Sequence, residues 1–396
     1  MVDISNIKTF AVIGAGVMGR EIAQVSLMAG FEKVILNDIS QKALEDATIY
    51  IENGLKKIEG KGKLSQGFTT DLLMSKLMKE IDLTKAVQKA DFIVEAIPEK
   101  MDLKQELFKK LGEVAPEHAV LATNTSTMSI SKIAESCKRA DKVIGMHYFI
   151  PIPILRLIEV IKGEKTSEET MEITISVGQK LPCLKGKRFI ARIEKESPGF
   201  IVNRLTIASS AYFNWLFDEA MKKGIPWESL DADVQDLQEL GPCARLDYLG
   251  LDTIYNTLNY FVEVLSPDFA PSKAITKLVN EGNLGRKTGR GFYEWTKDGT
   301  PIINKAEKAN LINFELFMAI QLNEGCRLLE EGVVSGYKVI DDTMLAGMSM
   351  PGPFGAGKRN YEKWSKLLED FVNKSGKEYF KPCELMKSGK FLKMRK

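Results

Sequence analysis

The sequence predicts an α/β fold in its first half and an all-helical fold in its second half. Three observations carry this prediction. The apolar run Thr9–Ile13 is followed at once by a glycine-rich turn and a helical pattern. Further short apolar runs alternate with helical patterns as far as residue 161, which is the rhythm of a parallel sheet covered by helices. From Ser197 onward the patterns are helical.

The glycine-rich turn reads G-x-G-x-x-G, and each glycine has its own function in a dinucleotide site. Gly14 allows the tight turn, Gly16 lets the backbone approach a pyrophosphate, and Gly19 lets the helix pack closely on the strand. Val17 and Met18 lie in the same turn, at a helix N-terminus whose free N–H groups attract an anion. The strand–turn–helix context favours a Rossmann-like dinucleotide-binding domain over a glycine turn without a ligand.

The second strand of this unit predicts which dinucleotide binds. The apolar run Val34–Leu36 ends on Asn37 and Asp38. Asp38 lies 19 residues after Gly19, where an acid accepts hydrogen bonds from both ribose hydroxyls. A 2′-phosphate would meet a like charge there. The sequence therefore predicts NAD rather than NADP.

Two helical patterns interrupt the alternation after Asp38. Residues 41–57 and 70–79 predict helices joined by a turn at 60–63, which makes a helical hairpin inserted between strands. The hairpin carries several lysines, which would suit the phosphates of a large anionic substrate but would equally suit a solvated helix face. Both interpretations stay open. The lysines are Lys56, Lys57, Lys61 and Lys63.

After this hairpin the alternation of strands and helices resumes. Several of the apolar runs predicted as strands end in polar residues. Strands are predicted at 91–96, 119–122, 142–147 and 156–161. Ligands of open parallel sheets lie beyond the carboxyl ends of the strands, so the residues at these ends form the candidate site. The candidates beside the glycine turn are Glu95, Ala96, Ile97, Glu99, Asn124, Thr125, Ser126 and His147.

The chain has two histidines, and histidine is the usual residue for proton transfer near neutral pH. His118 lies in a polar loop before a strand, at the opposite edge of the sheet, and is predicted to be a surface residue. His147 ends an apolar strand on the ligand side. Pro151 and Pro153 force an extended turn after it, and the next strand returns with Glu159. An antiparallel return would place this carboxylate against the imidazole, where it would fix the tautomer and stabilise the imidazolium.

The helical half contains an apparent repeat. A helix with polar and acidic residues, a short acidic helix and a Gly-Pro pair occur in the same order in 214–251 and in 320–355, although identity is low. The pattern is that of a duplicated helical domain. The predicted helices of the first copy are 198–221, 227–240 and 252–264. The predicted domains are 1–193 for dinucleotide binding, 194–299 for the first helical domain and 300–396 for a second, degenerate copy.

The composition excludes several classes of function. The 396 residues carry a formal net charge of +2, so nothing indicates a nucleic-acid partner. No apolar run approaches the ~20 residues needed to span a bilayer, and the N-terminus lacks the basic and apolar regions of a signal peptide. The five cysteines are far apart and form no C-x-x-C. This predicts neither disulfides nor a metal site, and it favours a reducing cytoplasm.

With these motifs in place, the chain resembles the (S)-3-hydroxyacyl-CoA dehydrogenase family across about residues 7–295. The order and spacing of the motifs carry the resemblance. They are the glycine turn, Asn124-Thr125-Ser126, residues 145–153, residues 157–161, residues 197–204, Gly241-Pro242, residues 246–252 and Gly-Arg-Gly-Phe-Tyr at 289–293. The resemblance implies a Rossmann-like domain followed by helical domains similar to the C-terminal domain of 6-phosphogluconate dehydrogenase.

The resemblance also implies a reaction, the NAD-dependent oxidation of a (S)-3-hydroxyacyl-CoA to the 3-oxoacyl-CoA. His147 is then the general base and Glu159 its partner. Ser126 and Asn203 hydrogen-bond the substrate oxygens and hold C3 near the nicotinamide ring. An acyl-CoA thioester is the implied substrate partner.

By the same matching, Glu99 and Lys104 contact the cofactor side of the cleft. The chain departs from the family at Ile150, where members usually have an asparagine near the cofactor, and this puts the cofactor contact there in doubt. It also has Cys243 where an aromatic residue usually follows Gly-Pro. The second copy lacks the 198–204 motif, so no second active site is expected.

Two other functions stay open. Relatives of this family oxidise small hydroxy acids such as L-gulonate without CoA, and a Rossmann-like subunit can bind NAD without catalysis. Assembly is open as well. Single-copy relatives pair through their helical domains, and a second copy within the chain would allow a monomer, with a homodimer as the alternative.

Overall fold

The computed structural model describes residues 2–236 and 240–396. The chain divides into two compact units, each of which gathers segments that are distant in the sequence. The first unit contains the residues up to Val202 together with Glu331–Gly352 and Lys396. The second contains Asn203–Glu330 and Pro353–Arg395. The three-domain division expected from the sequence stays a prediction, and the two units are described separately.

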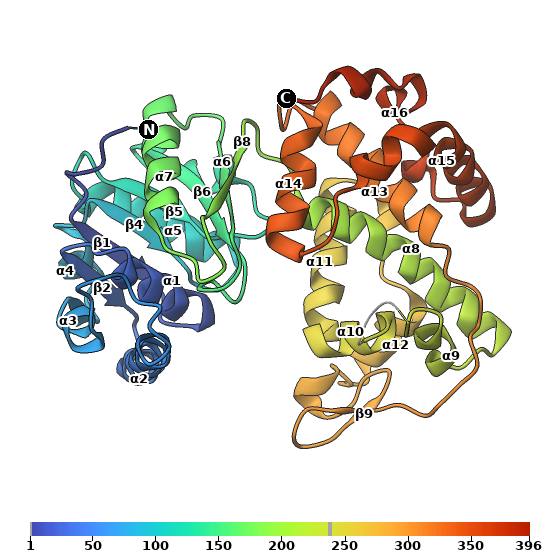
Figure 1. Ribbon diagram of the computed structural model, residues 1–396, viewed down its shortest axis with the longest axis horizontal. Helices are drawn as coiled ribbons and strands as arrows, with labels where there is room; N and C mark the ends of the chain where they lie inside the picture. The colour runs from blue at the N-terminus through green and yellow to red at the C-terminus, as the bar shows by residue number, and fades with distance from the viewer. Residues whose placement is uncertain (1, 237–239) are drawn as a thin grey trace. The chain divides into compact units, whose positions relative to one another are not determined.

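An eight-stranded sheet forms the centre of the first unit, in the order β3-β2-β1-β4-β5-β6-β7-β8 (Figure 1). All neighbouring strands are parallel except β6 and β7. The middle strands are buried on both faces, as their continuous apolar sequences require. The strands are β1 (Thr9–Ile13), β2 (Lys33–Asn37), β3 (Leu77–Glu80), β4 (Phe92–Glu95), β5 (Val120–Thr123), β6 (Val143–Tyr148), β7 (Leu157–Ile161) and β8 (Phe189–Ile193).

Helices surround this sheet, and several begin where a side chain caps them. Ser40 accepts from the Ala43 N–H at the start of α2, and Ser167 accepts from the Thr170 N–H at the start of α7. The helices of the first unit are α1 (Val17–Met28), α2 (Gln41–Glu59), α3 (Thr70–Met74), α4 (Leu83–Val87), α5 (Met101–Val114), α6 (Ile130–Ala134), α7 (Glu168–Lys180) and α14 (Tyr337–Met348).

The structure differs from the predicted secondary structure at one helix in this unit. The helix expected at 70–79 ends at Met74, because the next residues pair with β2 as the edge strand β3. There a long-range strand pairing overrides a local pattern. The domain boundary expected at 189–195 stays a prediction, and these residues begin with β8, which pairs in parallel with β7.

The segment around α14 is the part of the C-terminal region that joins the first unit. Its helix packs against β7 and β8. The N–H of Glu194, just after β8, donates to the Val333 carbonyl at 2.9 Å. Gly347 faces Leu157 so closely that a Cβ there would lie 2.5 Å from a Leu157 methyl group. A residue of the second copy thus packs against a strand of the predicted dinucleotide-binding domain.

The described residues of the second unit are mainly helical, and they include a short hairpin of β9 (Glu294–Trp295) and β10 (Pro301–Ile302). The helix expected at 227–240 is α9, which ends at Ala232, and residues 237–239 of that prediction lie outside the described part of the chain. The helices are α8 (Val202–Lys223), α9 (Trp227–Ala232), α10 (Pro242–Leu249), α11 (Leu251–Val264), α12 (Lys273–Asn280), α13 (Phe314–Glu330), α15 (Pro353–Ser375) and α16 (Glu384–Ser388).

Helix α8 packs on the two long helices of the second copy, α13 and α15 (Figure 1). Phe213 of α8 meets Phe317 of α13 at 5.8 Å between ring centroids, and Tyr212 meets Phe371 of α15 at the same distance. Arg204 forms a buried ion pair with Glu324. The two copies therefore share one core within the unit.

A contact between glycine and aspartate recurs in both copies. In the first, Gly241 precedes α10, and a Cβ there would lie 2.4 Å from the Asp231 carboxyl carbon. In the second, Gly352 precedes α15, and a Cβ would lie 2.1 Å from an oxygen of Asp341. Only glycine fits such an approach. The repeated Gly-Pro pairs thus have the same packing, which supports the duplication read from the sequence.

Candidate active site

The glycine turn has the shape that a dinucleotide site requires. Gly14 has a φ of 103°, and a Cβ there would lie 2.5 Å from the Ala96 carbonyl oxygen. A Cβ on Gly19 would lie 1.7 Å from the Gly14 carbonyl oxygen, so α1 packs directly on the end of β1. Gly16 has no heavy atom near its Cβ position within 4 Å. Two glycines therefore pack against protein and the third faces open space, which fits a pyrophosphate on the α1 N-terminus.

Asp38 lies directly beside this turn. One carboxylate oxygen accepts the Ala15 N–H at 2.8 Å, and the other accepts the Ser40 N–H at 2.9 Å. These bonds fix the acid at the end of β2. Ile97 is fixed in a similar way at the end of β4, since its N–H donates to Glu95 at 2.8 Å. The strand ends that flank the turn are thus held by carboxylates.

Lys104 is buried and joins two carboxylates, the buried Glu95 and the partly exposed Glu99. The Lys104 side chain is 1% exposed, and its ammonium lies 2.6 Å from Glu95 and 3.1 Å from Glu99. Thr123 donates to the other oxygen of Glu95 at 2.6 Å. Burial acts to raise the pKa of Glu99, but the charge of Lys104 and the hydrogen bond from Thr125 outweigh it, so the pKa is lowered.

This network supports the turn that carries Ser126. Glu99 accepts the Ser126 N–H at 2.9 Å and also accepts the Thr125 hydroxyl. Asn124, one residue earlier, accepts the Tyr148 N–H at 3.0 Å. The end of β5 is therefore tied to Glu99 on one side and to the end of β6 on the other, where His147 lies. Lys104 is connected to this turn through its contact with Glu99.

His147 and Glu159 are brought together by the one antiparallel pair of the sheet. They are direct partners in the register of β6 and β7, and the His147 Nδ1 lies 2.8 Å from a Glu159 oxygen. Glu159 is fully buried. An ionised carboxylate can only accept hydrogen bonds. Nδ1 therefore carries the proton in this pair, and Nε2 is left with its lone pair available as a base.

Asn203 belongs to the second unit, and His118 lies at the surface of the first. Asn203 is the second residue of α8 and belongs to the second unit, directly after Val202, whose N–H donates to Glu159. The His118 side chain is 66% exposed and pairs with Asp91 at 2.8 Å, so it is a surface residue, as expected.

Sequence reasoning missed Glu21 in α1. Its carboxylate is buried, and it accepts the Tyr50 hydroxyl at 2.9 Å and the Ile152 N–H at 2.7 Å. The inserted helix α2 and the loop after His147 are thus fastened to the cofactor helix by one side chain. Its partners are 29 and 131 residues away, so no local pattern identifies it.

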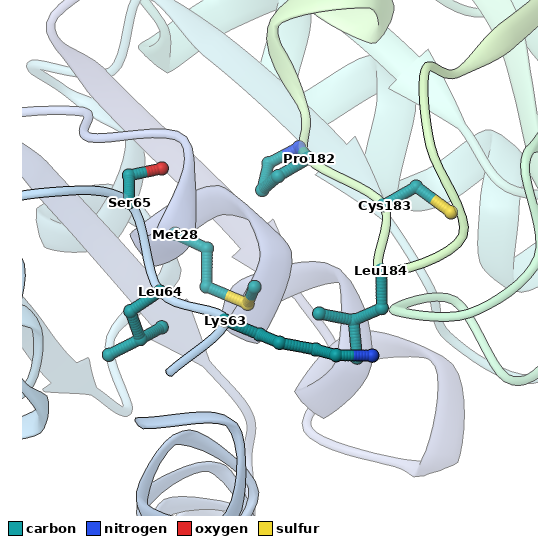
Figure 2. Close-up of a pocket in the computed structure, with 7 residues that line it drawn as sticks. All are labelled: Met28, Lys63, Leu64, Ser65, Pro182, Cys183 and Leu184. Carbon is teal, nitrogen blue, oxygen red and sulfur yellow. The ribbon is translucent and has the colours of Figure 1, made fainter. Parts of the chain in front are cut away.

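A small cavity of about 240 Å³ lies where the hairpin loop meets the end of α1. Figure 2 shows the Lys63 side chain extending toward Leu184, with Met28 beside them. Of the other hairpin lysines, Lys56 is paired with Glu52 at 2.6 Å. The remaining residues that line the cavity are Leu64, Ser65, Pro182 and Cys183.

The comparisons with known proteins agree with this geometry. Residues 9–188 match the model of the 3-hydroxyacyl-CoA dehydrogenase NAD-binding domain, and residues 199–295 match that of the 3-hydroxyacyl-CoA dehydrogenase C-terminal domain. The chain belongs to the 3-hydroxyacyl-CoA dehydrogenase family. The fold class and the NAD cofactor predicted from the sequence are thereby confirmed.

Several members of this family are similar over most of the chain. The mitochondrial hydroxyacyl-coenzyme A dehydrogenase of Sus scrofa is 35% identical over 73% of this chain and 91% of its own. The fatty acid oxidation complex subunit alpha of Shewanella putrefaciens is 32% identical over 96% of this chain and 55% of its own. The crystal structure of a 3-hydroxybutyryl-CoA dehydrogenase from Escherichia coli covers 98% of this chain, with a TM-score of 0.82 and 26% identity.

These last two matches extend through the C-terminal region that the two domain models leave out. In the described part of the chain, no cluster of three metal-ligating side chains occurs, and no helix has both the length and the apolar character needed to cross a membrane.

Proposed function

We propose that this dehydrogenase oxidises a (S)-3-hydroxyacyl-CoA to the 3-oxoacyl-CoA with NAD, and that His147 is its general base. The observation that carries the proposal is the buried bond between the His147 Nδ1 and Glu159, 2.8 Å long. It leaves Nε2 as the basic nitrogen at the carboxyl end of β6. That edge of the sheet is also the one that carries the glycine turn.

His147 removes the proton of the substrate 3-hydroxyl through Nε2 as the C3–H bond breaks. The imidazolium formed in this step is stabilised by Glu159, whose carboxylate is already in place and needs no reorganisation. Bound NAD supplies the acceptor for the hydride that leaves C3. In the reverse direction, the same imidazolium returns the proton to the carbonyl oxygen of the 3-oxoacyl group.

Ser126 and Asn203 hold the substrate. Each has a side chain that can donate to a carbonyl or hydroxyl oxygen. The support for Ser126 is its fixed backbone, because Glu99 accepts the Ser126 N–H at 2.9 Å. The support for Asn203 is its position directly after Val202, which is bound to Glu159. Their effect is to keep C3 in a reactive orientation.

The residues proposed to hold the cofactor have different roles. Some offer backbone groups, one offers a carboxylate to the ribose, and others support these groups. Gly16 faces open space where a pyrophosphate fits, and Asp38 lies beside it for the ribose hydroxyls. Ile150 is 49% exposed at the position where the family usually has asparagine, so an apolar contact replaces a polar one there. The remaining proposed residues are Gly14, Val17, Met18, Gly19, Ala96, Ile97, Glu99 and Lys104.

Turnover of NADH with acetoacetyl-CoA tests this function directly. We expect saturable oxidation of NADH that needs the CoA thioester. A matched assay with the free acid acetoacetate, and one with L-gulonate and NAD, distinguishes the alternative of a small hydroxy-acid dehydrogenase. Tight NADH binding without turnover on acyl-CoA thioesters of four to sixteen carbons would indicate a non-catalytic subunit.

We further propose that the protein is a monomer in the cytoplasm. In the second unit, α8 packs on α13 and α15 of the second copy. A single-copy chain would obtain such partner helices from another subunit, whereas here the same chain provides them. The five cysteines are free, which suits a reducing compartment. Sedimentation at micromolar concentration tests the assembly, and a dimer joined through residues 200–300 would refute it.

A further inference from the structure

Two phenylalanine rings pack against the imidazole of His147. The Phe149 ring centroid lies 4.4 Å from that of the imidazole, and the Phe200 centroid lies 5.7 Å from it. Both rings are tilted with respect to the imidazole, by 54° and 58°. Phe149 is a neighbour of His147 after β6, but Phe200 comes from a distant turn. Its presence beside the imidazole therefore depends on the fold.

The backbone of that turn has an unusual conformation. Phe200 has a φ of 56°, and Gly199 before it has a φ of 74°. The left-handed region is natural for glycine but strained for a bulky side chain. Strain of this kind persists only where the surroundings fix it, and it is concentrated at functional sites. An aromatic ring can fill a core from an ordinary backbone conformation. Packing alone therefore does not account for the left-handed conformation of Phe200.

Hydrogen bonds hold this turn on both sides of Phe200. Its own N–H donates to the Ser197 carbonyl at 2.9 Å. The next two N–H groups, of Ile201 and Val202, both donate to one oxygen of Glu159 at 3.1 Å. The other oxygen of Glu159 faces His147. A single carboxylate thus fixes the base and the turn that places a ring against the base.

We propose that Phe200 is a positioning residue for the reaction, which sets the plane of the His147 imidazole so that Nε2 faces the substrate. Glu159 alone fixes one atom of the ring, and rotation about that hydrogen bond remains possible. Ring contacts restrict this rotation. The inference rests on the proposed function, in which His147 is the base, and it explains why the chain keeps a strained phenylalanine at 200.

The test compares Phe200→Leu with Phe108→Leu. Phe108 on α5 is as fully buried as Phe200, so the control loses the same ring from the core of the same unit. We expect Phe200→Leu to lower kcat with acetoacetyl-CoA by about 10- to 100-fold, the range for a misplaced catalytic group. The KM and the NADH affinity should stay within threefold. Phe108→Leu should leave kcat unchanged. If Phe200→Leu does not fold, Phe200→Met, which keeps more of the volume, takes its place.

A spectroscopic measurement separates positioning from simple loss of stability. The chain has two histidines, so His118→Gln leaves His147 as the one imidazole in the nitrogen NMR spectrum. We expect a single Nδ1-protonated form in that background, and exchange broadening or a second set of ring signals when Phe200→Leu is added. An unchanged spectrum, or an unchanged kcat, would overturn the inference.

His147→Gln distinguishes failure of the inference from failure of the proposed function. If His147→Gln is inactive while Phe200→Leu turns over like the unaltered enzyme, only the positioning role is refuted. If His147→Gln itself retains the turnover of the unaltered enzyme, the base has been assigned wrongly, and Phe200 has nothing to position.

Discussion

The most informative substitution is Glu159→Gln, because the change is nearly isosteric and its effect follows from the hydrogen bonds. Three N–H groups meet the two oxygens of Glu159. His147 Nδ1 lies 2.8 Å from one oxygen, and the N–H groups of Ile201 and Val202 lie 3.1 Å from the other. Glutamine offers one acceptor oxygen and one NH₂ donor. The amide oxygen can therefore accept either from His147 or from the N–H groups of Ile201 and Val202, but not from both sides.

The cost of each orientation decides the outcome. If the amide oxygen faces His147, its NH₂ group is directed at two buried N–H donors. Each unsatisfied buried donor costs about 1–3 kcal/mol, so this arrangement is disfavoured by about 2–6 kcal/mol. In the other orientation the NH₂ group faces Nδ1, which must then accept. The proton moves to Nε2, and the imidazole is in the wrong tautomer to act as a base.

We therefore expect Glu159→Gln to lower kcat by about 10³- to 10⁴-fold, as an inverted tautomer does in a catalytic triad. This corresponds to about 4–5.5 kcal/mol in activation free energy. The assay is NADH oxidation with acetoacetyl-CoA. Glu164→Gln, at an exposed glutamate after β7, is the matched control and should be fully active. A Glu159→Gln enzyme that keeps more than a tenth of its turnover while remaining folded would refute the reasoning.

Three further predictions concern the rest of the site. Lys104→Met should destabilise the fold by about 3–5 kcal/mol in urea unfolding, since it leaves Glu95 as a buried charge without its partner; a loss below 1 kcal/mol would contradict this. Gly16→Ala should weaken NADH binding at least tenfold with an unchanged melting temperature, because its Cβ enters open space needed by the pyrophosphate. The double change Lys61→Ala and Lys63→Ala should raise the KM for acetoacetyl-CoA several-fold at constant kcat, at about 0.5–1 kcal/mol for each exposed charge contact; an unchanged KM would leave these lysines as solvated residues.

Much of the cofactor half could be predicted because its constraints are local. The glycine turn specifies backbone shapes that only glycine adopts, and the apolar runs of β1, β4 and β5 are too short and continuous for anything but buried strands. The contact between His147 and Glu159 was predictable for a similar reason. A proline-containing turn between two apolar runs makes their antiparallel pairing the simplest arrangement.

The features that could not be predicted depend on distant partners. Strand β3 has a mixed sequence at the edge of the sheet, and it is a strand only because β2 pairs with it. The burial of Lys104 between Glu95 and Glu99 cannot be seen in the sequence, where it is one of many lysines on a charged helix. The left-handed conformation of Phe200 likewise results from tertiary hydrogen bonds.

The measurement that tests the account most directly is the turnover of His147→Gln with acetoacetyl-CoA, made together with the affinity of the same variant for NADH. The glycine turn and Asp38 are unaltered in this variant, so NADH should bind as it does to the unaltered enzyme. Removal of the base should lower kcat by about 10²- to 10⁴-fold, the usual contribution of a positioned acid–base group. Turnover within fivefold of that of the unaltered enzyme, with NADH bound, would contradict the claim that His147 carries the reaction.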